Sequence, residues 1–144
     1  FTNVNRSEVL SRGVEVSVQS AVHPRVMWTG SGTYLDTDNR DEGAAPLRDR
    51  PLWQAQSQFD FMISDDINLY TAASFVGDFF NSSIPTGLIE VDGRLIMDAG
   101  MSWNVGDNVE VLLSGSNLFS VDYQEAIGVQ EPGPVFRFGL NFTI

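Results

Sequence analysis

The stretch "SGSNLFSVDYQEAIGVQEPGPVFRFGLNFTI", from Ser114 to Ile144, decides the fold class. Its last nine residues alternate between apolar side chains and other residues. The apolar members of this row are Phe136, Phe138, Leu140, Phe142 and Ile144. Neighbouring side chains of a β-strand point to opposite faces, so this alternation predicts a strand with one wholly apolar face.

The same period of two recurs along the whole chain, whereas a helical period of 3.6 fails nearly everywhere. The sequence therefore predicts an all-β fold. The expected strands are Gly13–Val22, Val26–Leu35, Leu52–Ile63, Ile67–Phe79, Arg94–Val105, Val109–Ser120 and Pro134–Ile144.

Short and long connections alternate between these strands. The short ones are the turns His23–Arg25, Ser64–Asp66 and Gly106–Asn108, and the long ones are the loops Asp36–Pro51, Asn81–Gly93 and Val121–Gly133. An antiparallel up-and-down meander of about seven strands has this pattern, with turns at one end and long loops at the other.

The two faces of the predicted sheet differ in chemistry. One face carries apolar side chains and no charged residue along all seven expected strands. The opposite face carries polar and charged side chains, among them Asp60, Arg94, Asp98 and Arg137. A soluble β-sandwich also alternates in this way, with its apolar face turned inward.

The heights of the aromatic residues favour a membrane barrel over a sandwich. Tyr34, Trp53 and Phe119 lie toward the long-loop end, and Trp28 and Trp103 lie toward the short-turn end. The two levels are eight residues apart on one strand, which spans roughly 21 Å along the membrane normal at a tilt near 40°. These aromatic side chains would then lie at the two membrane interfaces, and the polar face would line the barrel lumen.

Composition excludes several classes of function. The 144-residue chain has 8 basic and 19 acidic residues and a net charge of −11, which argues against a nucleic-acid partner. It has no cysteine and a single histidine, His23, so thiolate metal sites and Cys-His nucleophiles are excluded within it. No catalytic site is expected, and the chain is predicted not to be an enzyme.

Three stretches resemble the C-terminal part of the β-barrel of TonB-dependent outer-membrane receptors. They are "SRGVEVSV" (Ser11–Val18), "GTYLDTDNRDEGAAPLRDRP" (Gly32–Pro51) and "SGSNLFSVDYQEAIGVQEPGPVFRFGLNF" (Ser114–Phe142). They occur in the family's order and span most of the chain. The whole of residues 1–144 is therefore expected to be one barrel segment, without the plug domain.

The resemblance implies a larger transmembrane β-barrel of about 22 strands in the outer membrane of a Gram-negative bacterium. Such receptors take up a scarce nutrient, an iron-siderophore, cobalamin or a similar small molecule. The implied partners are outer-membrane lipid, the plug domain of the parent chain, the TonB complex and the small-molecule ligand. A self-contained small β-barrel or a soluble β-sandwich that acts as a binding module remains the alternative.

The long loop after the second expected strand contains a candidate ligand site. Asp36, Asp38, Asp41 and Glu42 are clustered there, and hard cations such as calcium bind clustered carboxylates. The spacing lacks the ligand positions of an EF-hand loop, so a solvated extracellular loop is the favoured interpretation. No cofactor is expected apart from this possible calcium ion.

Overall fold

The computed structural model describes residues 8–40, 43 and 45–143, all of them in strands, turns and loops. Within these residues, no helix has the length and apolarity that would let it cross a membrane. Asp41, Glu42 and Ile144 lie outside the described residues.

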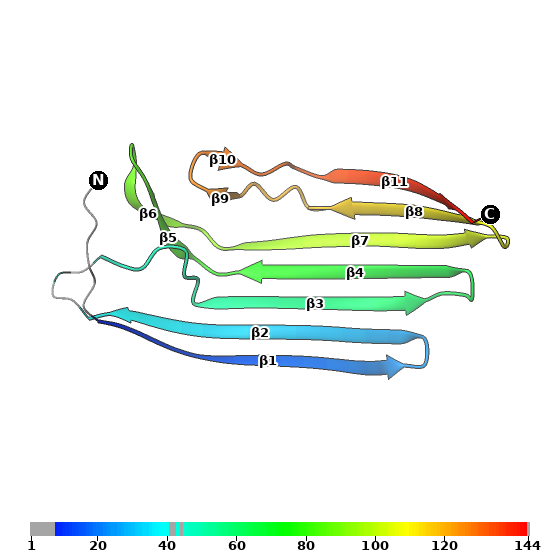
Figure 1. Ribbon diagram of the computed structural model, residues 1–144, viewed down its shortest axis with the longest axis horizontal. Helices are drawn as coiled ribbons and strands as arrows, with labels where there is room; N and C mark the ends of the chain where they lie inside the picture. Colours follow the sequence, from blue (N-terminus) through cyan, green and yellow to red (C-terminus); the bar gives the residue numbers. More distant parts are fainter. Residues whose placement is uncertain (1–7, 41–42, 44, 144) are drawn as a thin grey trace.

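Seven strands form one antiparallel sheet, and each lies beside the next strand of the sheet in chain order (Figure 1). The strands are β1 (Val9–His23), β2 (Val26–Asn39), β3 (Trp53–Met62), β4 (Ile67–Val76), β7 (Arg94–Val105), β8 (Val109–Ser116) and β11 (Val135–Phe142). The all-β up-and-down meander predicted from the sequence is confirmed.

Two of the long connections contain hairpins that sequence reasoning treated as loops. The β4–β7 connection contains β5 (Phe79–Ser83) and β6 (Gly87–Val91), and the β8–β11 connection contains β9 (Gln124–Ala126) and β10 (Val129–Gln130). Both hairpins form two-stranded sheets of their own. The strands β5 and β6 have five residues each, β9 has three and β10 has two, so they are too short for a hydrophobic period of two to reveal them.

Four strand ends differ from the prediction by three or more residues, and one of them is the start of β1, at Val9 and not at Gly13. Strand β2 continues to Asn39 because β1 begins at Val9 and pairs with it, so Asp36 and Asp38 are strand residues and not loop residues. Strand β4 ends at Val76, and Phe79 starts the separate strand β5. Strand β8 ends at Ser116, so Phe119 lies in the turn that follows it.

The register of the sheet confirms the sorting of side chains into two faces. Leu69, Met101, Leu113 and Phe138 lie opposite one another in a row across β4, β7, β8 and β11. The row one residue along contains Tyr70, Gly100, Ser114 and Arg137. Because adjacent rows point to opposite sides of the sheet, the apolar and polar sets stay separated across all strands.

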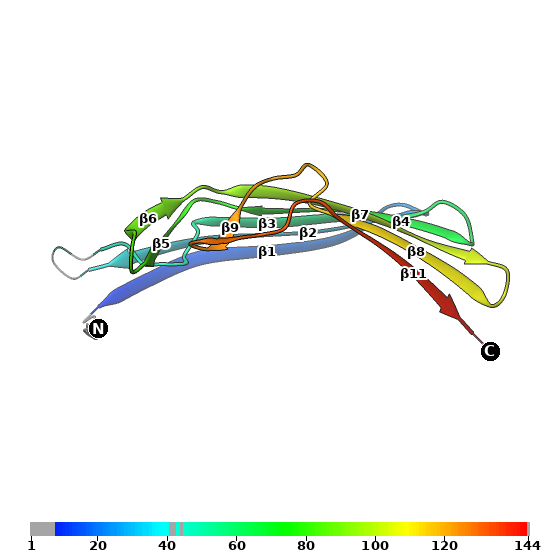
Figure 2. The same ribbon diagram turned by 90° about the horizontal axis from the view of Figure 1, so that it is seen from above.

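The sheet is a single arched layer (Figure 2). Phe79 is the only hydrophobic side chain that is buried among the described residues, and it lies outside the seven-stranded sheet. The apolar face exposes large side chains such as Val14, Trp53 and Phe138. A β-sandwich would bury this face against a second sheet, so the sandwich alternative is not supported.

The three short turns, which directly precede β2, β4 and β8, do not lie level with one another but are staggered along the strand direction (Figure 1). Val26, at the start of β2, lies opposite Phe61 of β3, and Ile67, at the start of β4, lies opposite Trp103 of β7. Strands β3 and β7 both continue beyond these pairs before they reach their own turns. Each turn is displaced by about two residues from the previous one, roughly 7 Å over two strand spacings of about 9.6 Å. Level turns would therefore require strands tilted by roughly 35–40°, which is the tilt of membrane barrels.

Candidate functional site

The polar face of the sheet is its concave face. Two hollows of about 720 and 240 Å³ are lined largely by side chains of the polar rows. Asp60 and Arg137 line the larger hollow toward the turn end, and Asp98 lines the smaller one. Arg94 belongs to the same face and lies at the loop end of β7. The four residues predicted to face the lumen thus share the inner side of the arch.

The larger hollow also contains apolar side chains that sequence reasoning missed. Met27, Met62, Tyr70 and Leu112 belong to the polar rows and line this hollow. Met27 and Tyr70 share one row across the sheet, and Met62 and Leu112 share another. Along its own strand each alternates mainly with polar residues, so the period-two pattern gave little sign of it. The register places them near one another toward the turn end.

Asp60 and Asp98 are not a catalytic pair. Asp60 accepts a hydrogen bond of 2.8 Å from Nε2 of Gln58 on its own strand. Asp98 accepts a hydrogen bond of 2.9 Å from the backbone N–H of Asn117. The two carboxylates lie in separate hollows on strands β3 and β7, and each has a partner of its own.

Asn117 organises the start of the β8–β11 connection. Its side chain is only 4% exposed, and its amide group donates to the backbone carbonyls of Val121 (2.9 Å) and Pro132 (3.3 Å). Its Oδ1 accepts from the N–H of Val121 at 2.9 Å. The backbone of Asn117 has a φ of +51°, a conformation that Asn tolerates better than most residues. The side chain of Asn117 therefore joins the two ends of this connection, and its backbone N–H attaches them to Asp98 of β7.

The same connection contacts Arg94. The guanidinium carbon of Arg94 lies 4.8 Å from the centre of the Tyr123 ring, which is a cation–π geometry. Arg94 points to the concave side, so the β9–β10 hairpin is held toward the interior of the arch. A basic and an aromatic side chain thus lie together at the loop end of the concave face.

We expect Asn117→Gly to loosen this connection. Glycine adopts a positive φ without strain, so this substitution removes only the side-chain hydrogen bonds of Asn117. Such bonds of a buried group are worth about 1–3 kcal/mol. Limited proteolysis of the full-length protein in membranes should show cleavage within residues 121–133 that is faster by on the order of tenfold. Ser120→Gly is the matched control, because Ser120 also has a positive φ of 54°. Equal cleavage of the two variants would contradict the role of Asn117.

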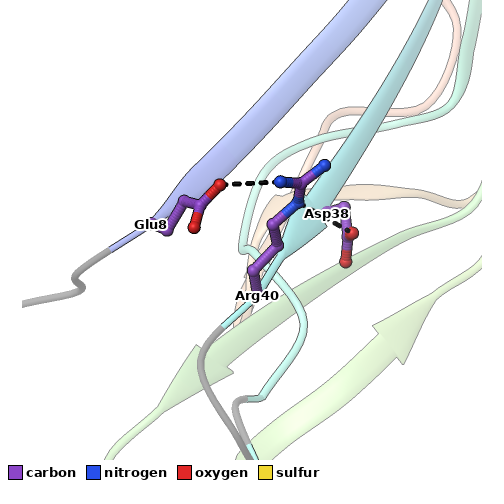
Figure 3. Close-up of polar contacts among 3 residues, drawn as sticks. All are labelled: Glu8, Asp38 and Arg40. Carbon is purple, nitrogen blue, oxygen red and sulfur yellow. Dashed lines mark hydrogen bonds and ion pairs between the residues drawn. The ribbon is translucent and has the colours of Figure 1, made fainter.

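Among the acidic candidates, Asp38 belongs to a small cluster of charged side chains with Glu8 and Arg40 at the loop end (Figure 3). Nη1 of Arg40 lies 2.7 Å from Oε1 of Glu8, and its Nε lies 3.7 Å from Oδ2 of Asp38. Asp36 is opposite Arg12 in the β1–β2 pair. Since Glu8, Asp38 and Arg40 are exposed, their ion pairs contribute little stability.

The calcium hypothesis stays a prediction. Asp36 and Asp38 lie two residues apart on one face of β2, but Asp41 and Glu42 fall outside the described residues. In the described part of the chain, no group of three or more His, Cys, Asp or Glu side chains is placed to hold a metal ion.

Four of the five predicted interface aromatics, Trp28, Tyr34, Trp53 and Trp103, belong to the apolar rows of the sheet, and Phe119 lies in the turn after β8. Tyr34 and Trp53 are opposite each other with ring centres 4.7 Å apart, and Trp53 is 54% exposed. Trp103 is 43% exposed near the turn end, and Phe119 is 73% exposed near the loop end. Their placement at two membrane levels stays a prediction, as does their contact with lipid.

Trp28 has a second role on this face. Its Nε1 donates a hydrogen bond of 2.9 Å to the hydroxyl of Ser57 on β3. Its ring lies over Gly30, where an added Cβ would come within 2.6 Å of Cζ2. Trp28 therefore gives the Ser57 hydroxyl a hydrogen-bond partner on the apolar face, and its ring covers the backbone of Gly30, which has no side chain of its own.

We expect Gly30→Ala to destabilise the protein and Gly32→Ala to be nearly neutral. The first Cβ would displace the Trp28 ring and break its bond to Ser57, at a cost of about 1–3 kcal/mol. At Gly32, on the same face of the same strand, the nearest atom to an added Cβ is 4.0 Å away. The free energy of refolding into lipid vesicles, followed by tryptophan fluorescence, would measure both costs. A Gly32→Ala cost as large as that of Gly30→Ala would refute the assignment.

Comparisons with known proteins place this sheet among receptor barrels. No protein-family model matches the chain. It is 23% identical over 152 residues to the ferric-pyoverdine M114 receptor PbuA of Pseudomonas sp. (strain M114), an alignment that covers 99% of this chain and 18% of that protein.

Solved structures give the same result for the fold. The ferric-catecholate import receptor Fiu of E. coli K12 matches with a TM-score of 0.80 and 21% identity, over 92% of this chain and 20% of Fiu. The receptor FpvA of P. aeruginosa, in its complex with a heterologous pyoverdine and iron, matches with a TM-score of 0.80 and 14% identity, over 93% of this chain and 19% of FpvA.

The chain spans about a fifth of the length of these proteins. The resemblance to siderophore receptors stated from the sequence is confirmed, and the meander has the fold of part of such a receptor. The matched proteins are named as receptors and not as enzymes, in agreement with the expectation for this chain.

Proposed function

We propose that this chain is the C-terminal wall segment of a TonB-dependent receptor, which takes up an iron-siderophore complex across the outer membrane of a Gram-negative bacterium. The observation that carries the proposal is the curvature of the sheet. Its convex face is apolar, and its concave face is polar and hollowed. Such a layer suits a wall between hydrocarbon and a water-filled or plugged lumen.

The two ends of the sheet then face different compartments. Short turns face the periplasm and the long connections face the outside, as is usual for bacterial outer-membrane barrels. The ligand would meet the loop end of the concave face, where Arg94, Tyr123 and the Asn117 connection lie. The wall alone cannot transport. Uptake would require a plug domain within the lumen and the TonB complex, both contributed from outside this segment.

The apolar part of the larger hollow supports a plug partner. Met27, Met62 and Leu112 would remain in contact with water if the lumen were empty. Burial against another protein segment would stabilise these side chains by about 25 cal/mol per Å² of apolar surface. Methionine adapts to irregular surfaces, which suits a contact that must open when the ligand passes.

The membrane placement predicts unequal costs for arginine at two adjacent residues. Met101 lies in the apolar row with Leu69 and Leu113, and Ser102 lies in the adjacent row, which points to the opposite side of the sheet. In the full-length receptor, Met101→Arg should cost about 2–4 kcal/mol because the guanidinium enters hydrocarbon, and Ser102→Arg should cost much less. Refolding free energies in lipid vesicles would measure the difference. Equal costs, or a larger cost at Ser102, would overturn the assignment of the two faces.

Uptake is tested directly in the host strain. Deletion of the full-length gene should abolish energy-dependent accumulation of radioactive iron supplied as ferric pyoverdine or as a ferric catecholate complex, and the intact gene should restore it. Labelled cobalamin serves as the comparison ligand. If neither iron complex depends on the gene and cobalamin does, the siderophore assignment is wrong but the receptor assignment stands. If no ligand depends on the gene, the proposed function fails.

A further inference from the structure

We propose that the β2–β3 connection and the β5–β6 hairpin form one composite loop, whose two parts are coupled and unfold locally together. The composite loop is defined here as residues 45–50 together with residues 77–93. It joins two connections that are separated in sequence by strands β3 and β4. In the proposed receptor it lies at the outer end of the wall.

Backbone pairing joins the two parts. Arg48 and Phe80 form an isolated parallel β-bridge. The N–H of Asp49 donates to the carbonyl of Phe80 at 2.8 Å, and Asp49 has a positive φ of 56°. That conformation costs energy for a residue other than glycine, and it is retained only where the surrounding contacts compensate for it. The bridge to Phe80 is such a contact.

A side-chain contact reinforces the bridge. Nη1 of Arg48 donates to the hydroxyl of Ser82 at 2.8 Å, two residues beyond the bridge. This bond is exposed and alone would contribute little. Together with the main-chain bond it fixes the β2–β3 connection along the length of β5 and leaves it no independent hinge at this point.

The hairpin is itself fixed at its base. Phe79, only 8% exposed, pairs with Val91 directly before the bridging residue Phe80. Oδ1 of Asp78 accepts a hydrogen bond of 2.6 Å from the N–H of Gly93, which closes the hairpin where it meets β7. The most buried hydrophobic side chain of the described residues therefore lies at the junction of the two connections.

The third long connection is attached to a different position on the sheet. Asp98 and the carbonyl of Met97 hold it through the N–H groups of Asn117 and Leu118. The composite loop thus meets β7 at Gly93, whereas the β8–β11 connection is held at Met97 and Asp98 and also places Tyr123 against Arg94, next to Gly93. The role of the composite loop at the ligand entrance rests on the proposed function, whereas the coupling itself does not.

Hydrogen–deuterium exchange of the full-length protein in detergent tests the coupling without any ligand. Phe79→Ala changes only the hairpin, yet we expect it to speed exchange of the Asp49 amide by about tenfold or more, since loss of the buried ring releases the bridge. Leu88→Ala is the matched control, because Leu88 is an exposed residue of the same hairpin. It should leave the Asp49 amide unchanged.

A surface substitution tests the reverse direction and avoids any risk to folding. Arg48→Ala should speed exchange within residues 79–83 by roughly two- to fivefold, as expected for one exposed hydrogen bond, and Arg50→Ala in the same connection should not. Exchange in β7 and β8 should stay unchanged in all variants. Faster exchange confined to the connection that carries each substitution would overturn the proposal, as would equal effects of each variant and its control.

Discussion

Backbone hydrogen bonding within one layer holds this structure together. A globular domain buries its apolar side chains between two layers, but here the seven-stranded sheet has no second layer and almost no buried side chain. Antiparallel pairing in a fixed register is what remains, and it determines the side of the sheet to which every residue points. The two faces can therefore contact different environments, and the apolar side chains can be buried in the surroundings of the sheet and not in a protein core.

Lateral contacts at the turn end extend this pairing beyond the strands. Nη1 of Arg25 donates to the carbonyl of Ile63, the carbonyl of Asp66 accepts from the N–H of Asn104, and Asn108 and Thr143 exchange two hydrogen bonds. Each contact joins a turn to the strand beside it. The turn end thus forms a continuous rim, whereas the loop end is divided between two separately attached groups of connections.

The sequence predicts the sheet well because period two is strong in every one of its strands. It predicts the strand ends poorly. Asp36 and Asp38 look like loop residues by composition, and only the pairing of β2 with the long strand β1 shows that they are in a strand. Isolated apolar residues on the polar face, such as Met27 and Leu112, were missed for a similar reason, because they come together only across strands far apart in the chain.

The contacts of Asn117 also could not be derived from sequence. The residue forms part of the stretch that carried the family resemblance, but its carbonyl partners Val121 and Pro132 lie at opposite ends of a loop, and the carboxylate of Asp98 comes from β7. An asparagine directly after an alternating strand was the only local sign, since asparagine tolerates a left-handed backbone. The resemblance identified the segment and gave no account of what the side chain does.

The constant stagger of the turns has an evolutionary consequence. Each hairpin adds two strands and displaces its turn by about the same two residues, so the tilt of the wall does not depend on how many hairpins it contains. Duplication or loss of a whole hairpin would change the circumference and leave the hydrophobic thickness unaltered. Gain or loss of a single strand would reverse chain direction and place the next long loop in the wrong compartment. Walls of this kind can therefore change size in units of one hairpin, and hardly in any smaller unit.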